Sequence, residues 1–394
     1  MKKKKLGFVV QRYGLEVNGG SEVLCRTLAE KLSKHYDIEA ITTCAIDHAT
    51  WSNAYPPGLH KVNNIPVHRF PVSLQRDVPL FVQLSNRVFG YQQNTSREDT
   101  LEWLRQIGPY SEELIGFIDT HKDSFDGFVF FTYLYATANF GLPLVKEKAF
   151  FVPTAHDEPY IKVPIFGEIF RAPKGIIFLS PEEQELVHRL FQNRNIPNVV
   201  TGIGVDFPQQ PANLSAFRKK YGLSKPYILY LGRIEPGKGA GELFEFFMRY
   251  KARGRHDIQL VLVGKNLIEI PNHPDIRHLG FVPEEDKLAA LAGTEVLVNH
   301  SAFESFSIVI TEAWALGIPV MVNGRCDVMA GQCARSNGGL WYESYEEFHK
   351  TLEWLLDNKE SAKKIGQQGK DYVSQHYSWP AVEQRYISFL DQFI

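Results

Sequence analysis

Two glutamates with seven residues between them, Glu304 and Glu312, flank the start of a predicted helix. The helix follows an apolar, strand-like run at 295–299, and Gly317 and Pro319 end it. A helix start offers unpaired N–H groups that suit a phosphate, whereas carboxylates beside it accept hydrogen bonds from hydroxyl groups. A phosphate flanked by polyols describes a nucleotide sugar. The plainer alternative is a pair of solvated helix-end glutamates.

A second motif upstream favours the first interpretation. Residues 227–231 predict a strand, 232–239 a glycine-rich turn, and 243–247 part of a helix. Arg233 leaves the strand end and Lys238 precedes the helix, so both side chains can face one anion, as a diphosphate requires. The glycine spacing matches neither the P-loop nor the dinucleotide fingerprint, which argues against an NAD enzyme.

Together the two motifs resemble the donor site of retaining glycosyltransferases of family 4, which have the GT-B fold. The resemblance rests on Gly232 to Gly239 and on the run from Glu304 through Glu312 to Val320. It implies that Arg233 and Lys238 hold the donor diphosphate and assist catalysis. It also implies that Glu312 binds the nucleotide ribose and that Glu304 binds the donor sugar.

The helix start departs from the family pattern. Ser305 and Ser307 stand where the family usually has glycines around the aromatic residue, and both are suited to capping a helix. The resemblance still implies donor contacts here, at Phe306, Ser307 and Ile308. The two serines leave open a local turn unlike that of the family.

Strand and helix patterns alternate through both halves, which predicts an α/β protein with doubly wound parallel sheets. With the resemblance, this becomes a GT-B fold of two Rossmann-like domains facing a cleft. In the N-terminal half we expect strands at 6–11, 38–43, 65–71, 126–131, 149–153, 175–179 and 198–205, and helices at 21–32, 133–145 and 181–191. Residues 80–122 predict helices broken at Gly108-Pro109, and 50–64 form a turn-rich segment.

The first expected strand leads into a helix through Asn18-Gly19-Gly20. Ligands of open α/β sheets bind at such strand ends. By the resemblance, Gly19 and Gly20 lie against the donor phosphate, and we place Asn18 near the acceptor. A simple tight turn is the alternative.

The strand at 149–153 ends in polar residues, among them His156, Asp157 and Glu158. In the family, a histidine at the end of this strand lies next to the transferred sugar, so we assign His156 a catalytic role. A structural histidine is equally consistent with the sequence. Asp157 and Glu158 are expected either to bind acceptor hydroxyls or to cap the next segment.

In the C-terminal half, 258–264 is an apolar run of the kind that a sheet buried on both faces requires. By the resemblance, the nucleotide base lies against Gly264, Lys265 and Val282. Contacts there are mostly to the backbone, so the sequence does not separate UDP, GDP and ADP donors. We favour a UDP-sugar as the co-substrate, with no other cofactor and no metal.

With 394 residues the chain is long enough for two domains. We expect an N-terminal, acceptor-binding domain at 1–207 and a C-terminal, nucleotide-sugar-binding domain at 208–376. The Pro/Gln-rich segment 205–211 is the predicted linker. By the resemblance, residues 377–394 form a helix that crosses back to the N-terminal domain.

The composition is that of an ordinary globular protein, with a formal net charge of −2 that argues against general nucleic-acid binding. The four cysteines show no metal-ligand spacing, which favours a reducing, cytoplasmic location. Lys2 to Lys5 precede the first strand, and leave open a weak attraction to the inner face of a membrane. Neither the acceptor nor the oligomeric state follows from the sequence.

The resulting hypothesis is a metal-independent, retaining glycosyltransferase that moves a sugar from a nucleotide diphosphate to an acceptor hydroxyl. A glycan or a lipid-linked acceptor of cell-surface polysaccharide biosynthesis fits this class, as does a small molecule. Two alternatives remain open on the same architecture. One is a nucleotide-sugar epimerase or a phosphorylase, and the other is a non-catalytic subunit that binds the nucleotide sugar for a partner.

Overall fold

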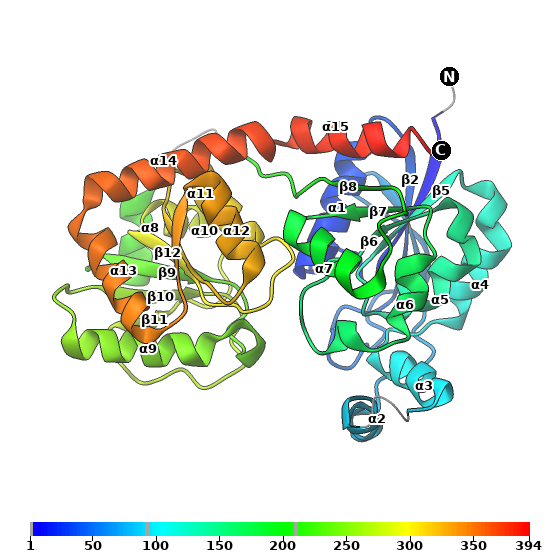
Figure 1. The fold of residues 1–394 in the computed structure, drawn as a ribbon, viewed down its shortest axis with the longest axis horizontal. Helices are drawn as coiled ribbons and strands as arrows, with labels where there is room; N and C mark the ends of the chain where they lie inside the picture. Colours follow the sequence, from blue (N-terminus) through cyan, green and yellow to red (C-terminus); the bar gives the residue numbers. More distant parts are fainter. Residues whose placement is uncertain (1–2, 91–94, 209–211) are drawn as a thin grey trace. The chain divides into compact units, whose positions relative to one another are not determined.

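The computed structural model of the chain describes residues 3–90, 95–208 and 212–394, and forms two compact units. Unit 1 comprises Met1–Gly202 and Glu383–Ile394, and unit 2 comprises Ile203–Val382 (Figure 1). The division therefore falls a few residues before the predicted boundary at 207/208. Residues 209–211 of the predicted linker lie outside the described residues. The last helix, α15 (Trp379–Leu390), is shared between the units rather than forming a separate segment.

Unit 1 contains one eight-stranded sheet in the order β3-β4-β2-β1-β5-β6-β7-β8. Neighbouring strands are parallel except for the antiparallel pair β3–β4. The chain order reverses between β1 and β5, as in a doubly wound fold. The strands are β1 (Lys5–Val9), β2 (Asp37–Thr43), β3 (Gly58–Val62), β4 (Ile65–Phe70), β5 (Gly127–Phe131), β6 (Ala149–Val152), β7 (Gly175–Phe178) and β8 (Asn198–Val200).

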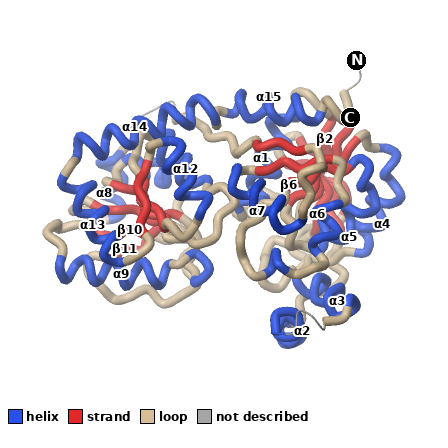
Figure 2. Tube along the Cα trace, in the orientation of Figure 1, coloured by secondary structure: helices blue, strands red, loops and turns tan. Residues whose placement is uncertain are grey.

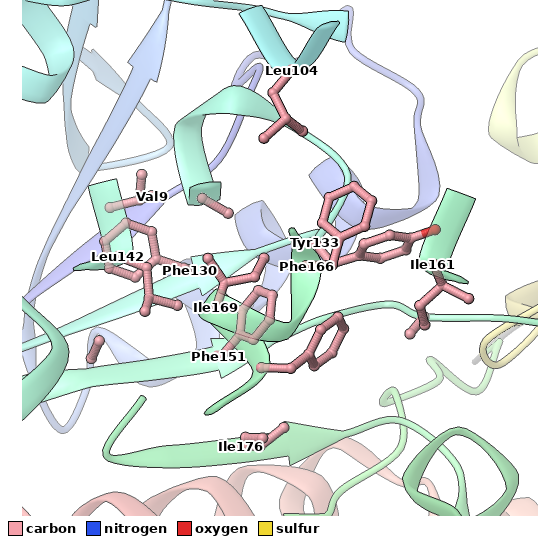
Figure 3. Close-up of a cluster of buried hydrophobic side chains, with 14 of the residues drawn as sticks. Val9, Leu104, Phe130, Tyr133, Leu142, Phe151, Ile161, Phe166, Ile169 and Ile176 are labelled. Atoms are coloured by element: carbon pink, nitrogen blue, oxygen red, sulfur yellow. The ribbon is translucent and has the colours of Figure 1, made fainter. Parts of the chain in front are cut away.

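The central strands of this sheet are apolar because helices cover both faces. All residues of β5, β6 and β7 are buried. Phe130 of β5 and Phe151 of β6 belong to one buried cluster with Phe166 and Ile169, which lie on a short helix that follows β6 (Figure 3). The helices of unit 1 are α1 (Gly20–Leu32), α2 (Val78–Gly90), α3 (Arg97–Ile107), α4 (Glu112–His121), α5 (Ala136–Gly141), α6 (Phe166–Arg171) and α7 (Pro181–Phe191).

Unit 2 contains a six-stranded parallel sheet in the order β11-β10-β9-β12-β13-β14. Its switch point lies between β9 and β12. Figure 2 shows the strands of each unit in its interior, with helices around them. The strands are β9 (Tyr227–Leu231), β10 (Gln259–Val263), β11 (Ile276–His278), β12 (Val296–Asn299), β13 (Val320–Asn323) and β14 (Gly339–Tyr342).

Seven helices lie wholly within the described part of unit 2: α8 (Leu214–Tyr221), α9 (Ala240–Arg253), α10 (Glu284–Ala292), α11 (Ile308–Ala315), α12 (Asp327–Ser336), α13 (Tyr345–Asp357) and α14 (Lys359–His376). Amphipathic spacing accounts for the longer ones, such as α13, whose buried residues include Phe348, Leu352 and Leu355. Over residues 3–90, 95–208 and 212–394, the longest and most apolar helices still fall short of what a bilayer span requires.

Three expectations for unit 1 differ from the structure. The segment 50–64 contains β3, a strand at the sheet edge with no buried residue, which gives only a weak apolar signal. The helix expected at 133–145 starts only at Ala136, because the Asn139 amide donates to the carbonyls of Tyr133 and Tyr135. It then continues as a 3₁₀ helix (Leu142–Lys148) with Pro143 in its first turn. The strand expected at 198–205 ends at Val200.

Candidate functional site

The carboxyl ends of β9 and β12 are neighbours in the sheet of unit 2, because the strand order reverses between them. The loop 232–239 leaves β9 and the loop 300–307 leaves β12. Lys238 Nζ lies 2.8 Å from Glu304 Oε1, so an ion pair joins the two loops. The two sequence motifs therefore meet at one point of unit 2.

Arg233 and Lys238 both keep part of their charge accessible, with side chains 47% and 29% exposed. Arg233 Nη2 lies 3.0 Å from Glu235 Oε1, and the Arg233 carbonyl accepts a hydrogen bond from the Tyr230 hydroxyl at 2.7 Å. A guanidinium carries five N–H donors and an ammonium three. Each cation can therefore keep its carboxylate partner and still donate to a bound anion.

The loop that carries Lys238 is pinned against the end of β12 by a glycine. Gly239 has φ +68° and is the N-cap of α9. A Cβ at this position would lie 2.5 Å from the His300 carbonyl oxygen, so any side chain would push the loops apart. The position of Lys238 relative to Glu304 thus depends on a residue without a side chain.

The start of α11 is held by side chains from elsewhere in unit 2. Ser307 is the N-cap residue and has φ +67°, but its side chain does not cap the helix, so the expected capping role is wrong for Ser307. Its Oγ instead accepts a hydrogen bond from the Asn299 amide at 2.9 Å. The Phe306 carbonyl accepts from the Gln332 amide at 2.6 Å, and the Phe306 ring is buried. Ile308 begins the helix beside this anchored turn.

Glu312 lies in the second turn of α11 and is paired with Lys287 of α10 at 2.9 Å. Burial raises the pKa of the Glu312 carboxyl, and the Lys287 ammonium partly offsets that rise. The side chain as a whole is 23% exposed. The sequence predicted Glu312 at this helix but not its partner from α10.

A buried network behind the 300–307 loop was not predicted. His300 is fully buried, and its two ring nitrogens lie 2.6 Å from the Tyr342 hydroxyl and 2.9 Å from Glu242 Oε2. Arg325 pairs with the same Glu242 carboxylate, and the Asn323 amide donates to the His300 carbonyl at 3.0 Å. Burial lowers the pKa of His300. The network fixes the base of the loop that carries Glu304.

The residues predicted to contact the nucleotide base lie at the carboxyl ends of β10 and β11. Gly264 has φ +140°, and a Cβ there would lie 2.0 Å from the Gly232 carbonyl oxygen. Its N–H donates to the Gly280 carbonyl at 2.9 Å, while the Lys265 carbonyl accepts a backbone N–H from the loop after β9. Val282 is 6% exposed. These turns are therefore packed directly on the loop that carries Arg233.

In unit 1, Gly19 is the N-cap residue of α1 and Gly20 is its first residue. The Asn18 amide donates to a carbonyl two residues earlier, at 3.3 Å. Beside them, Arg12 and Glu22 form a buried ion pair, with Arg12 Nε 2.8 Å from Glu22 Oε1. The sequence predicted the glycines but not this ion pair, because Arg12 and Glu22 are separated by the intervening loop.

His156 lies four residues after the end of β6, at the carboxyl edge of the same sheet. Its ring Nδ1 is 3.4 Å from Glu158 Oε1, and the same oxygen accepts a hydrogen bond from the buried Tyr133 hydroxyl at 2.6 Å. The Glu158 N–H donates to the His156 carbonyl at 2.8 Å. Glu158 is thus turned toward His156 and Tyr133.

Asp157, the third polar residue of this loop, is engaged in ion pairs. Asp157 Oδ1 lies 2.8 Å from Lys162 Nζ, and Oδ2 lies 3.5 Å from Arg189 Nη2. Its side chain is 48% exposed. Its place at the strand end is as predicted, and its role toward an acceptor stays a prediction.

One group of described residues has metal-ligand spacing, namely His256, Glu353 and Asp357, whose ligand atoms lie within 4.8 Å of one another. Arg255 already binds both carboxylates, at 2.7 Å and 2.5 Å, and the Tyr250 hydroxyl donates to Glu353 at 2.7 Å. With a guanidinium between the carboxylates, the group is satisfied as an ion-pair cluster. It lies away from the loops described above, between the end of α9 and α13.

Comparison with known proteins finds similar sequences for about half of the chain, and a family model matches its C-terminal part. Residues 215–372 match the family described as "Glycosyl transferases group 1". The chain is 29% identical over 217 residues to O-antigen chain mannosyltransferase B of Escherichia coli, covering 48% of this chain and 56% of that one. It is 24% identical over 233 residues to the MMP alpha-(1->4)-mannosyltransferase of Mycolicibacterium hassiacum, covering 51% and 55%. The chain thus spans about half the length of these curated relatives.

Solved structures resemble the whole chain. Sucrose-phosphate synthase from Thermosynechococcus elongatus has a TM-score of 0.70 at 16% identity and covers 99% of both chains. Anabaena HepE in complex with UDP-glucose has a TM-score of 0.72 at 15% identity, covering 98% of this chain and 99% of that one. The likeness is one of fold. The predicted GT-B class, with two doubly wound α/β domains, is confirmed.

Proposed function

We propose that the chain, whose residues 215–372 match the glycosyl transferases group 1 family, is a retaining glycosyltransferase. It transfers a sugar from a nucleotide-diphosphate donor to an acceptor hydroxyl. Unit 2 binds the donor and unit 1 binds the acceptor. This proposal concerns the whole protein, whereas the family match covers unit 2.

One observation supports the donor site above all others, the junction of Lys238 with Glu304 at the switch point of the sheet. A cation for phosphate and a carboxylate for sugar hydroxyls lie 2.8 Å apart there. Arg233, on the same loop as Lys238, adds a second cation with spare N–H donors. The start of α11 supplies backbone N–H groups and partial positive charge. We assign Arg233 and Lys238 to the diphosphate, and Glu304 to the donor sugar.

The proposed reaction breaks the bond between the sugar C1 and the diphosphate oxygen and forms a bond from C1 to the acceptor oxygen on the same face. The electron pair of the broken bond stays on the diphosphate, whose growing charge Arg233 and Lys238 stabilise. The acceptor proton passes to a leaving phosphate oxygen. His156 is assigned to the sugar being transferred, and Glu312 to the ribose. In this scheme Arg233 and Lys238 neutralise the diphosphate charge, and no metal ion is needed.

For the donor we propose a UDP-sugar over a GDP- or ADP-sugar. Anabaena HepE, a structural neighbour at low identity, binds UDP-glucose. For the acceptor we propose a saccharide of a growing cell-surface polysaccharide, free or lipid-linked. The Escherichia coli relative is named for an O-antigen chain. Both assignments rest on the similar proteins. The residues assigned to the base are expected to contact it mostly through the backbone, so their side chains do not identify the base.

The test is turnover followed by ¹H NMR, with UDP-, GDP- and ADP-sugars and a panel of saccharide acceptors. A retaining enzyme gives a product whose anomeric coupling matches that of the donor. An inverted product contradicts the retaining assignment. Activity that persists in excess EDTA supports the metal-independent scheme, and activity that is lost in EDTA and restored by a divalent cation contradicts it.

The alternatives give different results in the same assay. An epimerase converts or hydrolyses the donor with no acceptor present. A non-catalytic subunit binds the donor and turns over none of it. We take the presence of the complete set of Arg233, Lys238, Glu304 and Glu312 as support for the transferase over the non-catalytic subunit.

A further inference from the structure

A single carboxyl group ties together the ends of two strands beside His156. Glu183, near the start of α7, is 1% exposed. Its Oε1 accepts the N–H of Ala155 at 2.5 Å, and its Oε2 accepts the N–H of Leu179 at 2.6 Å. Ala155 immediately precedes His156, and Leu179 follows the end of β7. One buried side chain therefore fixes the backbone on both strands.

On the other side, two threonines tie the same loop to β5. Thr132 follows β5 with φ +67°, and Thr154 follows β6 with φ +51°. Left-handed backbone is uncommon for a β-branched residue and is retained only where its surroundings enforce it. Thr154 Oγ1 donates to Thr132 Oγ1 at 3.3 Å, and the Thr132 N–H donates to the Val152 carbonyl at 2.9 Å. The backbone before His156 is thus held from both neighbouring strands.

The geometry shows why a carboxyl group serves at this position, because both of its oxygens can accept a hydrogen bond. The two N–H groups come from different strands, and each carboxyl oxygen accepts one of them. A glutamine would place an NH₂ group against one N–H donor, and an alanine would leave both N–H groups buried without an acceptor. Capping of α7 does not require this arrangement, because the Ser180 hydroxyl already accepts the N–H of Glu183 at 3.1 Å.

We propose that Glu183 is a positioning residue that holds His156 in its working place by fixing the Ala155 N–H. The catalytic meaning of this inference rests on the proposed function, whereas the hydrogen bonds of Glu183 do not depend on it. Glu183 has no direct contact with a substrate in this scheme. It acts through the backbone, while Glu158 contacts the His156 ring and accepts a hydrogen bond from the Tyr133 hydroxyl.

The kinetic test compares Glu183→Gln in two backgrounds, wild type and His156→Ala. In the wild-type background we expect kcat to fall roughly 10–100-fold, because a small misplacement of a reacting group has a cost of this order. The KM for the donor should change much less than kcat, since the diphosphate is assigned to Arg233 and Lys238 of unit 2. In the His156→Ala background the same substitution should change kcat by less than about twofold, because coupled residues are not additive.

Glu185→Gln is the matched control. Glu185 lies on the same helix, is 62% exposed and pairs with Arg194 at 2.6 Å. It should leave kcat and KM unchanged. An equal loss of kcat from Glu183→Gln in both backgrounds, or no loss in either, overturns the proposal. If Glu183→Gln does not fold, Thr154→Gly takes its place in the same cycle, since glycine keeps the left-handed backbone and removes the hydroxyl contact.

Amide hydrogen exchange tests the positioning contact without an activity assay. Glu183→Gln should speed exchange at Ala155 and Leu179 and leave the interior of α7, at Val187, protected. Uniform acceleration across unit 1, or none, overturns the proposal. A protein that turns over no donor but shows the local acceleration would refute the proposed function and keep the contact. Local acceleration with unchanged kcat would refute the positioning role and keep the function.

Discussion

In unit 2 the charges of the candidate site are partly exposed and paired across loops, whereas in unit 1 the carboxyl group proposed to fix the candidate catalytic histidine is buried. Lys238 and Glu304 lie at the surface, 29% and 17% exposed. Glu183 is 1% exposed and is bound by backbone N–H groups rather than by a cation. A site for a charged ligand needs accessible charge, and a site that positions one side chain needs rigid backbone.

Because the two sites differ in burial, substitutions in them should have different effects on ligand binding and on stability. Exposed pairs contribute little to stability, so neutralising one in unit 2 should remove ligand binding and leave the fold. A buried carboxyl carries a large desolvation cost that its hydrogen bonds must offset. Altering Glu183 should therefore change stability and its pH dependence as well as function.

The largest effect is expected from Lys238→Ala. It removes one of the two cations assigned to the leaving diphosphate, and kcat/KM should fall on the order of 10²–10³-fold. The free energy of unfolding without ligand should change by less than about 1 kcal/mol, because the Lys238–Glu304 pair is partly exposed. Steady-state kinetics and chemical denaturation measure the two effects separately. A variant that unfolds readily would show that the site is structural.

The second effect concerns the pH dependence of stability. Burial raises the pKa of Glu183 to about 8, although three backbone N–H groups lower it. The folded state therefore holds this proton more tightly than the unfolded chain, whose carboxyl has an ordinary pKa of about 4.3. As pH rises between these two values, the free energy of unfolding should fall, on the order of 3 kcal/mol for this group.

Other groups titrate in the same window, so the difference between wild type and Glu183→Gln isolates the contribution. Burial lowers the pKa of His300, which makes stability rise with pH up to the ordinary histidine range. The contribution of His300 to the pH dependence is the same in wild type and in Glu183→Gln, so it cancels in the difference between them. Urea denaturation from pH 5 to pH 8.5 should give a difference that grows steadily in favour of the glutamine variant. A constant difference would contradict the buried, proton-holding carboxyl.

A smaller effect is expected from Asn299→Ala in unit 2. The Asn299 amide donates to Ser307 Oγ and holds the left-handed turn before α11. Losing this buried hydrogen bond should lower the free energy of unfolding by about 1–2 kcal/mol. Nucleotide affinity should weaken as well, since the start of α11 is assigned to the diphosphate. Ser307→Gly is the matched variant, because glycine adopts the same backbone without the bond.

The smallest effect is expected from Arg253→Ala, which serves as the control for the loss of a positive charge. Arg253 on α9 is 63% exposed and pairs with Glu346 at 3.5 Å. Arg253→Ala removes a cation from unit 2 without touching the loops of the site. The free energy of unfolding should change by less than about 0.5 kcal/mol, and nucleotide binding should not change. A loss of binding in this variant would mean that net charge, rather than the placed cations, attracts the nucleotide.

The sequence predicted where the candidate donor loops of unit 2 lie, because three of the residues assigned to the donor follow a strand within a few positions. Arg233 and Lys238 lie within eight residues of β9, and Glu304 lies within five of β12. Parallel strands bring their carboxyl ends to one edge, so placing the strands places the residues. His156 was found by the same argument at the end of β6.

The partners of these residues could not be found in that way. Lys287 and Glu312 are 25 positions apart on separate helices, and Glu183 is 28 positions from Ala155. No periodicity connects such pairs, since only the register of the folded sheet brings them together. The pattern Ser180-x-x-Glu183 predicts a helix cap, and indeed Ser180 caps α7. Nothing in that pattern shows that the Glu183 carboxyl turns to two other strand ends.

The most direct test of the donor site is thermal stabilisation by UDP, GDP and ADP, measured on wild type, on the double variant Arg233→Ala/Lys238→Ala and on the Arg253→Ala control. A nucleotide at ~100 times its dissociation constant should add about 2.7 kcal/mol to the native state. We expect one nucleotide, UDP first, to stabilise the wild type and the control but not the double variant. Equal stabilisation of all three proteins, or of none by any nucleotide, would contradict a donor site built on Arg233 and Lys238.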